Sequence, residues 1–443
     1  MKSRKLLSAG ALLAVILLVA AGCSKKEDNT GGSAGGATQK CQADQFGCVV
    51  YKPGEPIKLG TLLAISGDVA FLGTDSQHGA QLALDNLDGN MDGKLGQTLG
   101  HNWTMVNEDD LCSKDGGQAG GTKLASEPNL LAVIGTSCSS SALGVADKIL
   151  SDKGIILLSP SNTNPNLTGE GTHQPFYART AHNDKIQGAI VADFAFEKLG
   201  IKTAATIHDE SPYADALAAV FRDVFVQKGG TITANGNQAI QSADTDFKPL
   251  LTTIAQDKPD FLYFPDFDPA CALIAKQAAE VPGLEKTALA GSDGCLESAF
   301  LKTGGNAVFG TYASGPDLSA IKQGGFYSQL VAAYKAQFGT DPTASFHAHA
   351  YDAVNILVEA LKKVAIKGTD GTLSIPRTAL KDALLATSSF KGVSGVLTCT
   401  PLGDCATDVT IAVYKAPDFP VEGGNPNSVP VFSETKKLTD VGG

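Results

Sequence analysis

Residues 130–141 read LLAVIGTSCSSS, a run of apolar residues that turns polar at Thr136. An apolar run of this length predicts a strand that is buried on both faces. A helix is predicted directly after it, at about 140–152, and a second apolar run follows at 155–158. A buried strand, a helix and another buried strand in succession are typical of a parallel sheet joined by right-handed crossovers.

The same alternation recurs along most of the chain. Other strand-like runs lie at 57–65, 203–207, 261–264 and 287–290, and predicted helices lie at 75–87, 213–228, 269–281, 325–338 and 347–364. A hairpin is predicted near the end, from 395–398 through a turn at 401–404 to 409–414. We therefore expect an α/β protein of two Rossmann-like lobes, each with a central parallel sheet.

The composition excludes several classes of protein. Of 443 residues, 43% are hydrophobic and 18% are charged, which excludes a disordered chain and a coiled coil. The formal charge is −11, and it becomes −14 beyond the basic residues Lys2, Arg4 and Lys5. An acidic chain repels the phosphates of a nucleic acid, so no nucleic-acid partner is expected.

The N-terminus has the pattern of a secretory signal, in which basic residues precede the apolar stretch 6–21. Residues 19–23, VAAGC, resemble a bacterial lipobox. This resemblance implies that residues 1–22 are removed and that Cys23 becomes the lipidated first residue. An uncleaved anchor helix is the alternative, although the stretch is shorter than the ~20 residues that a membrane span requires.

The segment after Cys23 is polar and rich in glycine, serine and threonine up to Lys40. Such a composition predicts a flexible tether, so we expect residues 23–56 to contain the lipid anchor, this tether and a small cysteine loop. The protein is then expected to be lipid-anchored in the cell envelope and to face the periplasm or the exterior. Residues 417–443, which are rich in proline, glycine and asparagine at their start, are expected to form a loose C-terminal tail.

Nine cysteines indicate an oxidising compartment. Eight remain after Cys23, and eight cysteines allow 105 connectivities. Pairing of neighbours along the chain closes the shortest loops and joins Cys41 with Cys48, Cys112 with Cys138, Cys271 with Cys295, and Cys399 with Cys405. A zinc site is the competing interpretation, but the sequence contains no C-x₂-C pair.

Candidate binding residues follow the predicted strands, because ligands of open α/β sheets bind outside the carboxyl ends of the strands. Hydroxyl groups, including those of Ser139 and Thr163, gather in the first half of the chain and favour a carboxylate. Asp293, with Asp266 or Asp268, favours an ammonium group. A zwitterionic amino acid carries both groups. In the alternative interpretation these residues bind no ligand: the serines cap helices and the aspartates form turns.

Several segments resemble the branched-chain amino acid-binding proteins of bacterial ABC importers. They include GTSCSSS at 135–141, SPSNTNPNLT at 159–168 and IHD at 207–209, and the similarity runs from about Ile57 to Tyr414. This resemblance implies a type I periplasmic-binding fold, in which three crossover strands join two lobes that close on the ligand. It also implies the first-lobe disulfide Cys112–Cys138.

The resemblance places passages between the lobes near 180–183, 313–316 and 391–395. Lobe 1 is accordingly expected to contain residues 57–181 and 315–391, and lobe 2 residues 182–314 and 392–416. The implied partners are a small-molecule ligand, the membrane subunits of an ABC permease, and the membrane itself through the N-terminal lipid. No cofactor is implied.

The family's ligand-binding positions can be assigned residue by residue. They fall on Ser139, Ser161 and Thr163 in the first lobe and on Tyr213, Phe267, Asp293 and Gly294 in the second. Asp184 matches an acidic residue near the pocket. Four positions depart from the family pattern: Leu72 replaces an aromatic residue, Asp266 and Asp268 replace the commoner glycine and tyrosine, and Asp293 is shorter than the usual glutamate. A polar or cationic amino acid, or a small amide, is therefore an alternative ligand.

The function expected from the sequence is the binding of an amino acid and its delivery to a permease. A ligand sensor or chemoreceptor-type protein of the same fold is the alternative within this class. An exported hydrolase is the alternative from another class, but neither the spacing of a catalytic triad nor a set of metal ligands is recognisable. We therefore expect a protein that is not an enzyme.

Overall fold

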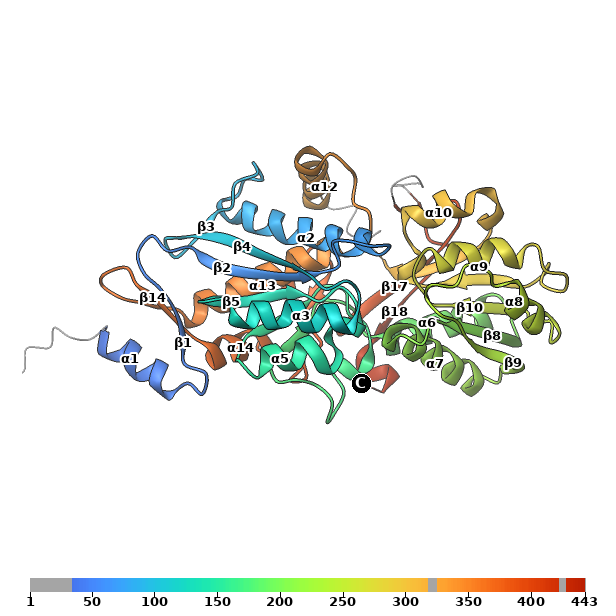
Figure 1. The fold of residues 1–443 in the computed structure, drawn as a ribbon, viewed down its shortest axis with the longest axis horizontal. Coiled ribbons are helices and arrows are strands. Elements are labelled where there is room, and N and C mark those ends of the chain that lie inside the picture. The colour runs from blue at the N-terminus through green and yellow to red at the C-terminus, as the bar shows by residue number, and fades with distance from the viewer. Residues whose placement is uncertain (1–33, 318–324, 422–427, 443) are drawn as a thin grey trace, which may run out of the picture.

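The computed structural model describes residues 34–317, 325–421 and 428–442. These residues form two lobes, each built around its own sheet (Figure 1). The α/β class predicted from the sequence is confirmed. The predicted signal sequence and the lipidated Cys23 lie outside the described residues. Among the helices that are described, none is both long enough and apolar enough to cross a membrane.

The first lobe contains a six-stranded sheet in the order β3–β4–β2–β5–β6–β7. Its strands are β2 (Ile57–Leu63), β3 (Gln97–Thr98), β4 (His101–Asp109), β5 (Leu130–Gly135), β6 (Ile156–Ser159) and β7 (Tyr177–Arg179). All neighbouring strands run parallel except β3 and β4. Every residue of β5 and β6 is buried, as their unbroken apolar sequences predict.

Helices cover both faces of this sheet, because alternate side chains of a strand point to opposite faces. Ala132 and Ile134 pack against α2 and α13, whereas Val133 packs on the other face with α3 and α5. The helices of this lobe are α2 (Ala70–Asp85), α3 (Lys114–Ser126), α4 (Ser139–Ser141), α5 (Asp147–Ser151), α12 (Gly325–Phe338), α13 (His347–Val364) and α14 (Arg377–Leu385).

The helix expected at 140–152 is interrupted. Leu143 and Gly144 leave the helical region, and Gly144 has a φ of 68°, a backbone conformation that glycine adopts without strain. The short helix α4 therefore stands apart from α5.

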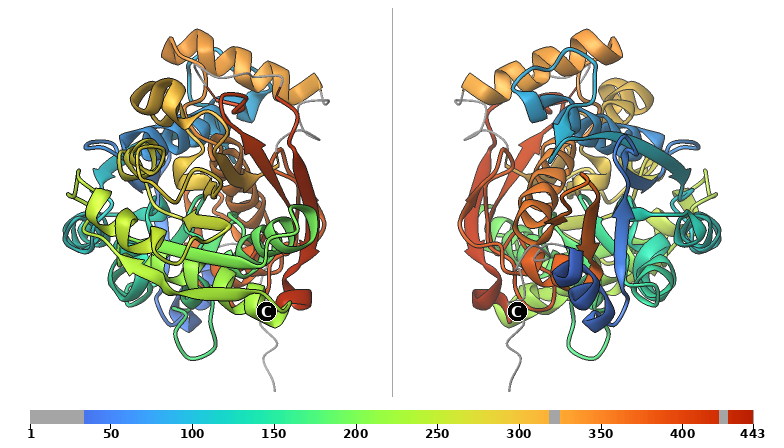
Figure 2. Two further views of the ribbon diagram at one scale, coloured as in Figure 1. Left: turned by 90° about the vertical axis from the view of Figure 1, so that its right-hand side faces the viewer. Right: turned by 90° about the vertical axis from the view of Figure 1, so that its left-hand side faces the viewer.

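The second lobe contains a seven-stranded sheet in the order β18–β17–β12–β11–β10–β8–β9. Its strands are β8 (Thr203–His208), β9 (Thr231–Ala239), β10 (Phe261–Phe264), β11 (Ala288–Gly291), β12 (Tyr312–Pro316), β17 (Asp408–Lys415) and β18 (Phe432–Lys437). The strands from β8 to β12 are parallel, and β17 and β18 are antiparallel to their neighbours. Figure 2 shows helices on both sides of this sheet.

One face of the second sheet packs against α6 and α7, and the other packs against α8, α9 and α10. These helices are α6 (Asp184–Asp193), α7 (Pro212–Gln227), α8 (Lys248–Ala255), α9 (Ala270–Ala278) and α10 (Ser298–Gly304).

The chain passes between the lobes three times. It leaves the first sheet after β7 and enters α6, which packs on α7 of the second lobe. It returns between β12 and α12, a helix that packs on α2. Leu397, Cys405 and Ala406 still pack in the core of the first lobe, so the third passage follows Ala406. This position is later than the predicted 391–395, because the intervening segment buries its apolar residues in the first lobe.

Three expectations about the chain ends are wrong. Part of the predicted tether forms a helix, α1 (Ala34–Ala43), and β1 (Cys48–Tyr51) pairs with β14 (Leu373–Pro376), which also pairs with β13 (Ile366–Lys367). The predicted hairpin is absent because β16 (Val396–Leu397) pairs with β15 (Phe390–Lys391), whereas β17 pairs with β12 and β18. The expected loose tail is wrong for β18, which adds a strand to the second sheet.

All four disulfides between neighbouring cysteines are present: Cys41–Cys48, Cys112–Cys138, Cys271–Cys295 and Cys399–Cys405. The first joins α1 to β1, and the third joins α9 to the segment after β11. The prediction of local pairing is confirmed.

Candidate functional site

A cavity of about 460 Å³ lies between the two lobes. Segments that follow β2, β4 and β5 line it from the first lobe, and segments that follow β8, β9 and β10 line it from the second lobe. The cavity therefore lies outside the carboxyl ends of both sheets, where ligands of α/β proteins bind. Its volume falls within the range of sites for small molecules.

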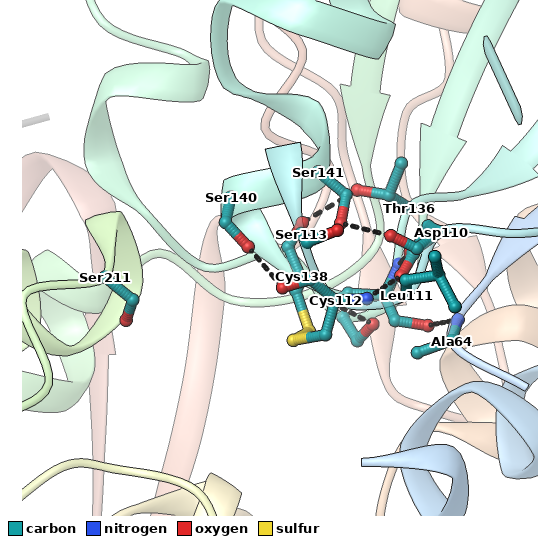
Figure 3. Close-up of a disulfide and its surroundings, with 12 residues drawn as sticks. Ala64, Asp110, Leu111, Cys112, Ser113, Thr136, Cys138, Ser140, Ser141 and Ser211 are labelled. Atoms are coloured by element: carbon teal, nitrogen blue, oxygen red, sulfur yellow. Dashed lines mark hydrogen bonds between the residues drawn. A yellow bond between two sulfur atoms is a disulfide. The ribbon is translucent and has the colours of Figure 1, made fainter. Parts of the chain in front are cut away.

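The disulfide Cys112–Cys138 supports the first-lobe wall of this cavity (Figure 3). Ser140 donates a hydrogen bond to the carbonyl oxygen of Cys112 at 3.0 Å, which joins the segment after β5 to the segment after β4. Ser211 of the second lobe lies on the opposite side of the cavity. The wall is therefore held by both covalent and hydrogen bonds.

The buried side chain of Asp110 holds two segments of the same wall together through hydrogen bonds to their backbone. Its carboxylate accepts hydrogen bonds from the backbone N–H of Ser137 at 2.6 Å and of Cys112 at 2.7 Å. Burial raises the pKa of Asp110 to about 7, and these two hydrogen bonds act in the opposite direction. Sequence reasoning missed this residue, because nothing in the sequence around β4 indicates which backbone groups its carboxylate meets.

The three predicted first-lobe residues, Ser139, Ser161 and Thr163, are all buried. Ser139 Oγ accepts a hydrogen bond from the backbone N–H of Asn164 at 3.3 Å, and Ser161 Oγ donates one to the carbonyl oxygen of Ser137 at 2.9 Å. Thr163 Oγ1 has no hydrogen-bond partner among the described residues. A buried hydroxyl without a partner is unfavourable, so Thr163 has unused capacity for a ligand.

Tyr213 and Asp293 meet in the second lobe, as expected of two residues of one site. The Tyr213 hydroxyl donates to Asp293 Oδ1 at 2.9 Å and lies 2.6 Å from Ser292 Oγ. Gln187 Nε2 also donates to Asp293 Oδ1, at 2.9 Å. Gln187 Oε1 is hydrogen-bonded to Nε2 of the buried His182. Gln187 and His182 were missed by sequence reasoning, although Gln187 lies three residues after Asp184 and so on the same helix face.

Asp184 is fully buried, and neither of its carboxylate oxygens has a hydrogen-bond partner in the described part of the chain. Burial raises the pKa of Asp184 well above its ordinary value, and the nearby carboxylate of Asp293 raises it further. The Thr163 hydroxyl acts in the opposite direction without reaching hydrogen-bond geometry. Two carboxylates and a free hydroxyl thus converge on one small buried region.

Phe267, Leu72 and Gly294 shape the apolar side of the site. The rings of Tyr213 and Phe267 lie 5.0 Å apart, and Phe267 packs with Leu72 of the first lobe. The backbone N–H of Gly294 is 3.4 Å from the Tyr213 hydroxyl. Residues from both lobes therefore contact each other around Phe267.

Asp266 and Asp268 flank Phe267 and are both buried. Neither oxygen of Asp266 has a hydrogen-bond partner among the described residues, and the same is true of Asp268 Oδ2. Burial, and after it the neighbouring Glu297, raise the pKa of Asp268 to about 9. Glu297, which is also buried, was missed by sequence reasoning, because it lies six residues beyond the end of β11 and nothing local indicates that it faces Asp268.

The structure divides the predicted residues into two layers. Tyr213, Phe267 and Asp268 line the cavity itself. The remaining predicted residues are buried or lie outside the lining: Leu72, Ser139, Ser161, Thr163, Asp184, Asp266, Asp293 and Gly294. Tyr213 belongs to both layers, because it lines the cavity and its hydroxyl binds Asp293.

Comparisons with known proteins point to one family. The family model described as "Periplasmic binding protein" matches residues 56–415. A Leu/Ile/Val-binding protein of Rhizobium johnstonii is 27% identical over 360 residues, which cover 81% of this chain and 91% of the relative. A leucine-, isoleucine-, valine-, threonine- and alanine-binding protein of Pseudomonas aeruginosa is 28% identical and covers 70% of this chain and 79% of its own length.

Solved structures show the same fold. A leucine-binding protein of Thermotoga maritima has a TM-score of 0.72 at 24% identity and covers 87% of this chain and 99% of its own. A solute-binding protein of an ABC transporter from Rhodopseudomonas palustris, solved in complex with benzoate, has a TM-score of 0.71 at 22% identity. The match covers 86% of this chain and 97% of that protein.

Proposed function

Because this chain belongs to the periplasmic binding protein family, we propose that it is the extracytoplasmic solute-binding component of an ABC importer. In this proposal the ligand is an amino acid, branched-chain or related, held between the two lobes. The names of the Leu/Ile/Val-binding relatives support this class of ligand. The family relatives are solute-binding proteins, and this chain is not an enzyme.

One observation carries the proposal: Asp184 is fully buried beside Asp293, and both of its oxygens lack a hydrogen-bond partner among the described residues. Burying carboxylates without a counter-charge costs free energy, so a site of this kind is completed by a cationic donor. An α-ammonium group supplies three N–H donors and one positive charge. Thr163 Oγ1, which is also unpartnered, adds a further acceptor.

The Ser139 hydroxyl, which accepts a hydrogen bond from Asn164 and keeps its own proton free among the described residues, is proposed to donate to the α-carboxylate of the ligand. Ser161 is proposed to do so by turning its O–H from the carbonyl oxygen of Ser137. Both lie in polar segments that follow first-lobe strands, Ser139 after β5 and Ser161 after β6, whereas the carboxylates belong to the second lobe. A ligand that joins the two groups contacts both lobes, and only the closed arrangement permits all of these contacts. Binding therefore selects the closed state. In the structure Asn164 Nδ2 already donates a hydrogen bond to the carbonyl oxygen of Pro212 across the lobes.

Delivery completes the proposed function. A lipid on Cys23 would hold the protein at the membrane surface, and the helix α1 and the Cys41–Cys48 disulfide would join this anchor to the first lobe. The closed protein would then present both lobes to the membrane subunits of a permease. Growth of a deletion strain on the identified ligand as sole nitrogen source, with and without a Cys23→Ala copy of the gene, tests the anchor and the delivery.

Titration calorimetry with a panel of amino acids, and with benzoate, tests the ligand class. We expect binding of at least one α-amino acid, and Asp293→Ala should weaken that binding by roughly 2 kcal/mol because the ammonium loses a charged partner. Asp223→Ala removes an exposed carboxylate of α7 and serves as the control. Absence of binding to every amino acid would reject the ligand class, and unchanged affinity of Asp293→Ala would reject the assigned site.

A further inference from the structure

The charged side chains that line the 460 Å³ cavity are all carboxylates. They are Asp68, which is exposed, Asp209, which is half-buried, and Asp268, which is 4% exposed. The described lining contains no lysine, arginine or histidine. The wall of the cavity is therefore acidic, and no basic side chain of the described lining is present to pair with these carboxyl groups.

The carboxylates behind this wall also lack partners. Asp268 Oδ1 accepts a hydrogen bond from the backbone N–H of Ala272 at 3.1 Å, but Oδ2 has no partner among the described residues. Both oxygens of Asp266 and Oε1 of Glu297 are likewise buried without a partner. None of these three side chains takes part in an ion pair found in the described part of the chain. These buried acidic groups have no internal counter-charge in the described structure, so a bound cation would supply one and favour their ionised forms over the protonated forms.

The pKa shifts of Asp266 and Asp268 agree with their burial and with their lack of basic partners among the described residues. Burial raises the pKa of Asp266 well above its ordinary value, and the charge of Asp209 raises it further. Burial and then Glu297 act in the same direction on Asp268. In both cases the interacting side chain that raises the pKa is another carboxylate, so an incoming positive charge would relieve repulsion as well as form new contacts.

An organic cation suits this cavity better than a metal ion. The described residues contain no group of three or more His, Cys, Asp or Glu side chains placed to hold a metal. The rings of Tyr213 and Phe267, 5.0 Å apart, provide an apolar wall beside Asp268. Such a wall packs against the methylene groups of a long side chain and attracts its cationic end.

We infer that the cavity selects amino acids whose side chains end in an ammonium or guanidinium group. This inference rests on the proposed function, in which the buried layer around Asp293 holds the α-ammonium group. Tyr213 connects the two layers, because it lines the cavity and its hydroxyl binds Asp293. A ligand held by its α-ammonium beside Asp293 therefore extends its side chain past Tyr213 toward Asp268 and Asp209.

Calorimetry with matched pairs of ligands tests the inference on the purified protein at low salt and pH 7.5. L-lysine and L-norleucine differ in the terminal ammonium, and L-arginine and L-citrulline differ in the charge of the terminal group. We expect the cationic member of each pair to bind at least about tenfold more tightly. The preference should shrink as salt is added, because ions screen the half-exposed Asp209.

Variants locate the effect. Asp268→Asn and Asp209→Asn should each reduce the preference for lysine over norleucine by several-fold, whereas Asp223→Asn, on the exposed face of α7, should leave it unchanged. Asp268→Asn also offers an N–H donor to Glu297 in place of a repelling carboxylate, so we expect its melting temperature to rise. A gain in stability together with a loss of lysine binding separates charge recognition from misfolding, and Asp209→Asn gives a second test at a less buried site.

Two results would overturn the inference. Binding of norleucine or leucine as tightly as lysine would reject selection of cations and leave the amino-acid function intact. Absence of binding to every amino acid in the panel would reject both proposals.

Discussion

Gly294 shows how a residue without a side chain shapes the site. A Cβ atom at this position would lie 2.4 Å from the carbonyl oxygen of Asp266 and 2.9 Å from Cδ1 of Phe267. Because the carbonyl belongs to the backbone and cannot turn aside, Gly294→Ala should displace the segment that carries Phe267. We predict a loss of about 1–3 kcal/mol in the free energy of unfolding, measured by urea denaturation, and weaker binding of the amino-acid ligand.

Gly325→Ala is the matched control for this substitution. No atom lies within 4 Å of a Cβ at Gly325, which begins α12. Alanine favours helix over glycine by up to about 1 kcal/mol, so this variant should be as stable as the parent or slightly more stable. Similar losses in both variants would contradict the steric argument.

At the scale of single residues, the polar residues of the site could be identified from the sequence, whereas their hydrogen-bond partners could not. Asp293 and Tyr213 could be named because they follow predicted strands and match a known family. Gln187 could not, because its contact with Asp293 depends on how α6 lies against β12, and His182 is linked to Asp293 only through Gln187. A hydrogen-bond partner on another element is not encoded in any local pattern.

At the scale of elements, a buried ion pair joins the first and third passages between the lobes. Arg179 Nε lies 2.7 Å from Asp404 Oδ1, and the two side chains are 0% and 5% exposed. Asp404→Ala would leave the guanidinium buried without its counter-charge, so we predict a loss of about 3 kcal/mol in the free energy of unfolding. Denaturation in urea measures this loss.

The exposed ion pair Lys148–Asp152 is the control for the buried pair Arg179–Asp404. Its side chains are 57% and 59% exposed, so Asp152→Ala should cost less than about 0.5 kcal/mol. If Asp404→Ala proved equally mild, the buried pair would not be what holds the two passages together.

The predicted hairpin failed at this scale for a clear reason. The segments 395–398 and 409–414 both have strand-like sequences, and proximity along the chain favoured pairing them. In the structure the first remains with the first lobe and the second joins the other sheet. The choice of partner strand was decided by which lobe could bury each segment.

At the scale of the whole molecule, buried carboxyl groups make stability depend on pH. Burial raises the pKa of Asp268 to about 9 and raises the pKa of Asp184 and Asp266 well above their ordinary range. The folded protein therefore keeps protons that the unfolded chain releases near pH 4. The stability that these protons confer is complete below pH 4 and is lost as pH rises toward each folded pKa.

We predict that the melting temperature falls between pH 7 and pH 9. The buried histidines His182 and His349 do not oppose this fall, because burial lowers their pKa below the ordinary value of 6.5. Each carboxyl group that stays protonated contributes on the order of 1.4 kcal/mol per pH unit. Differential scanning calorimetry measures the trend, and Asp268→Asn should flatten it. A melting temperature that is constant or rises over this range would contradict the prediction.

The sequence by itself determined the α/β class, the local disulfides and the residues that follow the strands. These features depend on short-range patterns: apolar runs, cysteine spacing and the polar residues at strand ends. The tertiary structure alone decided which of those residues share a site. It placed Asp68, Asp209 and Asp268 around one cavity and set Asp184 beside Asp293. The physical reason is that charge acts through space, so the two lobes must fold before carboxylates distant in sequence can act on one another.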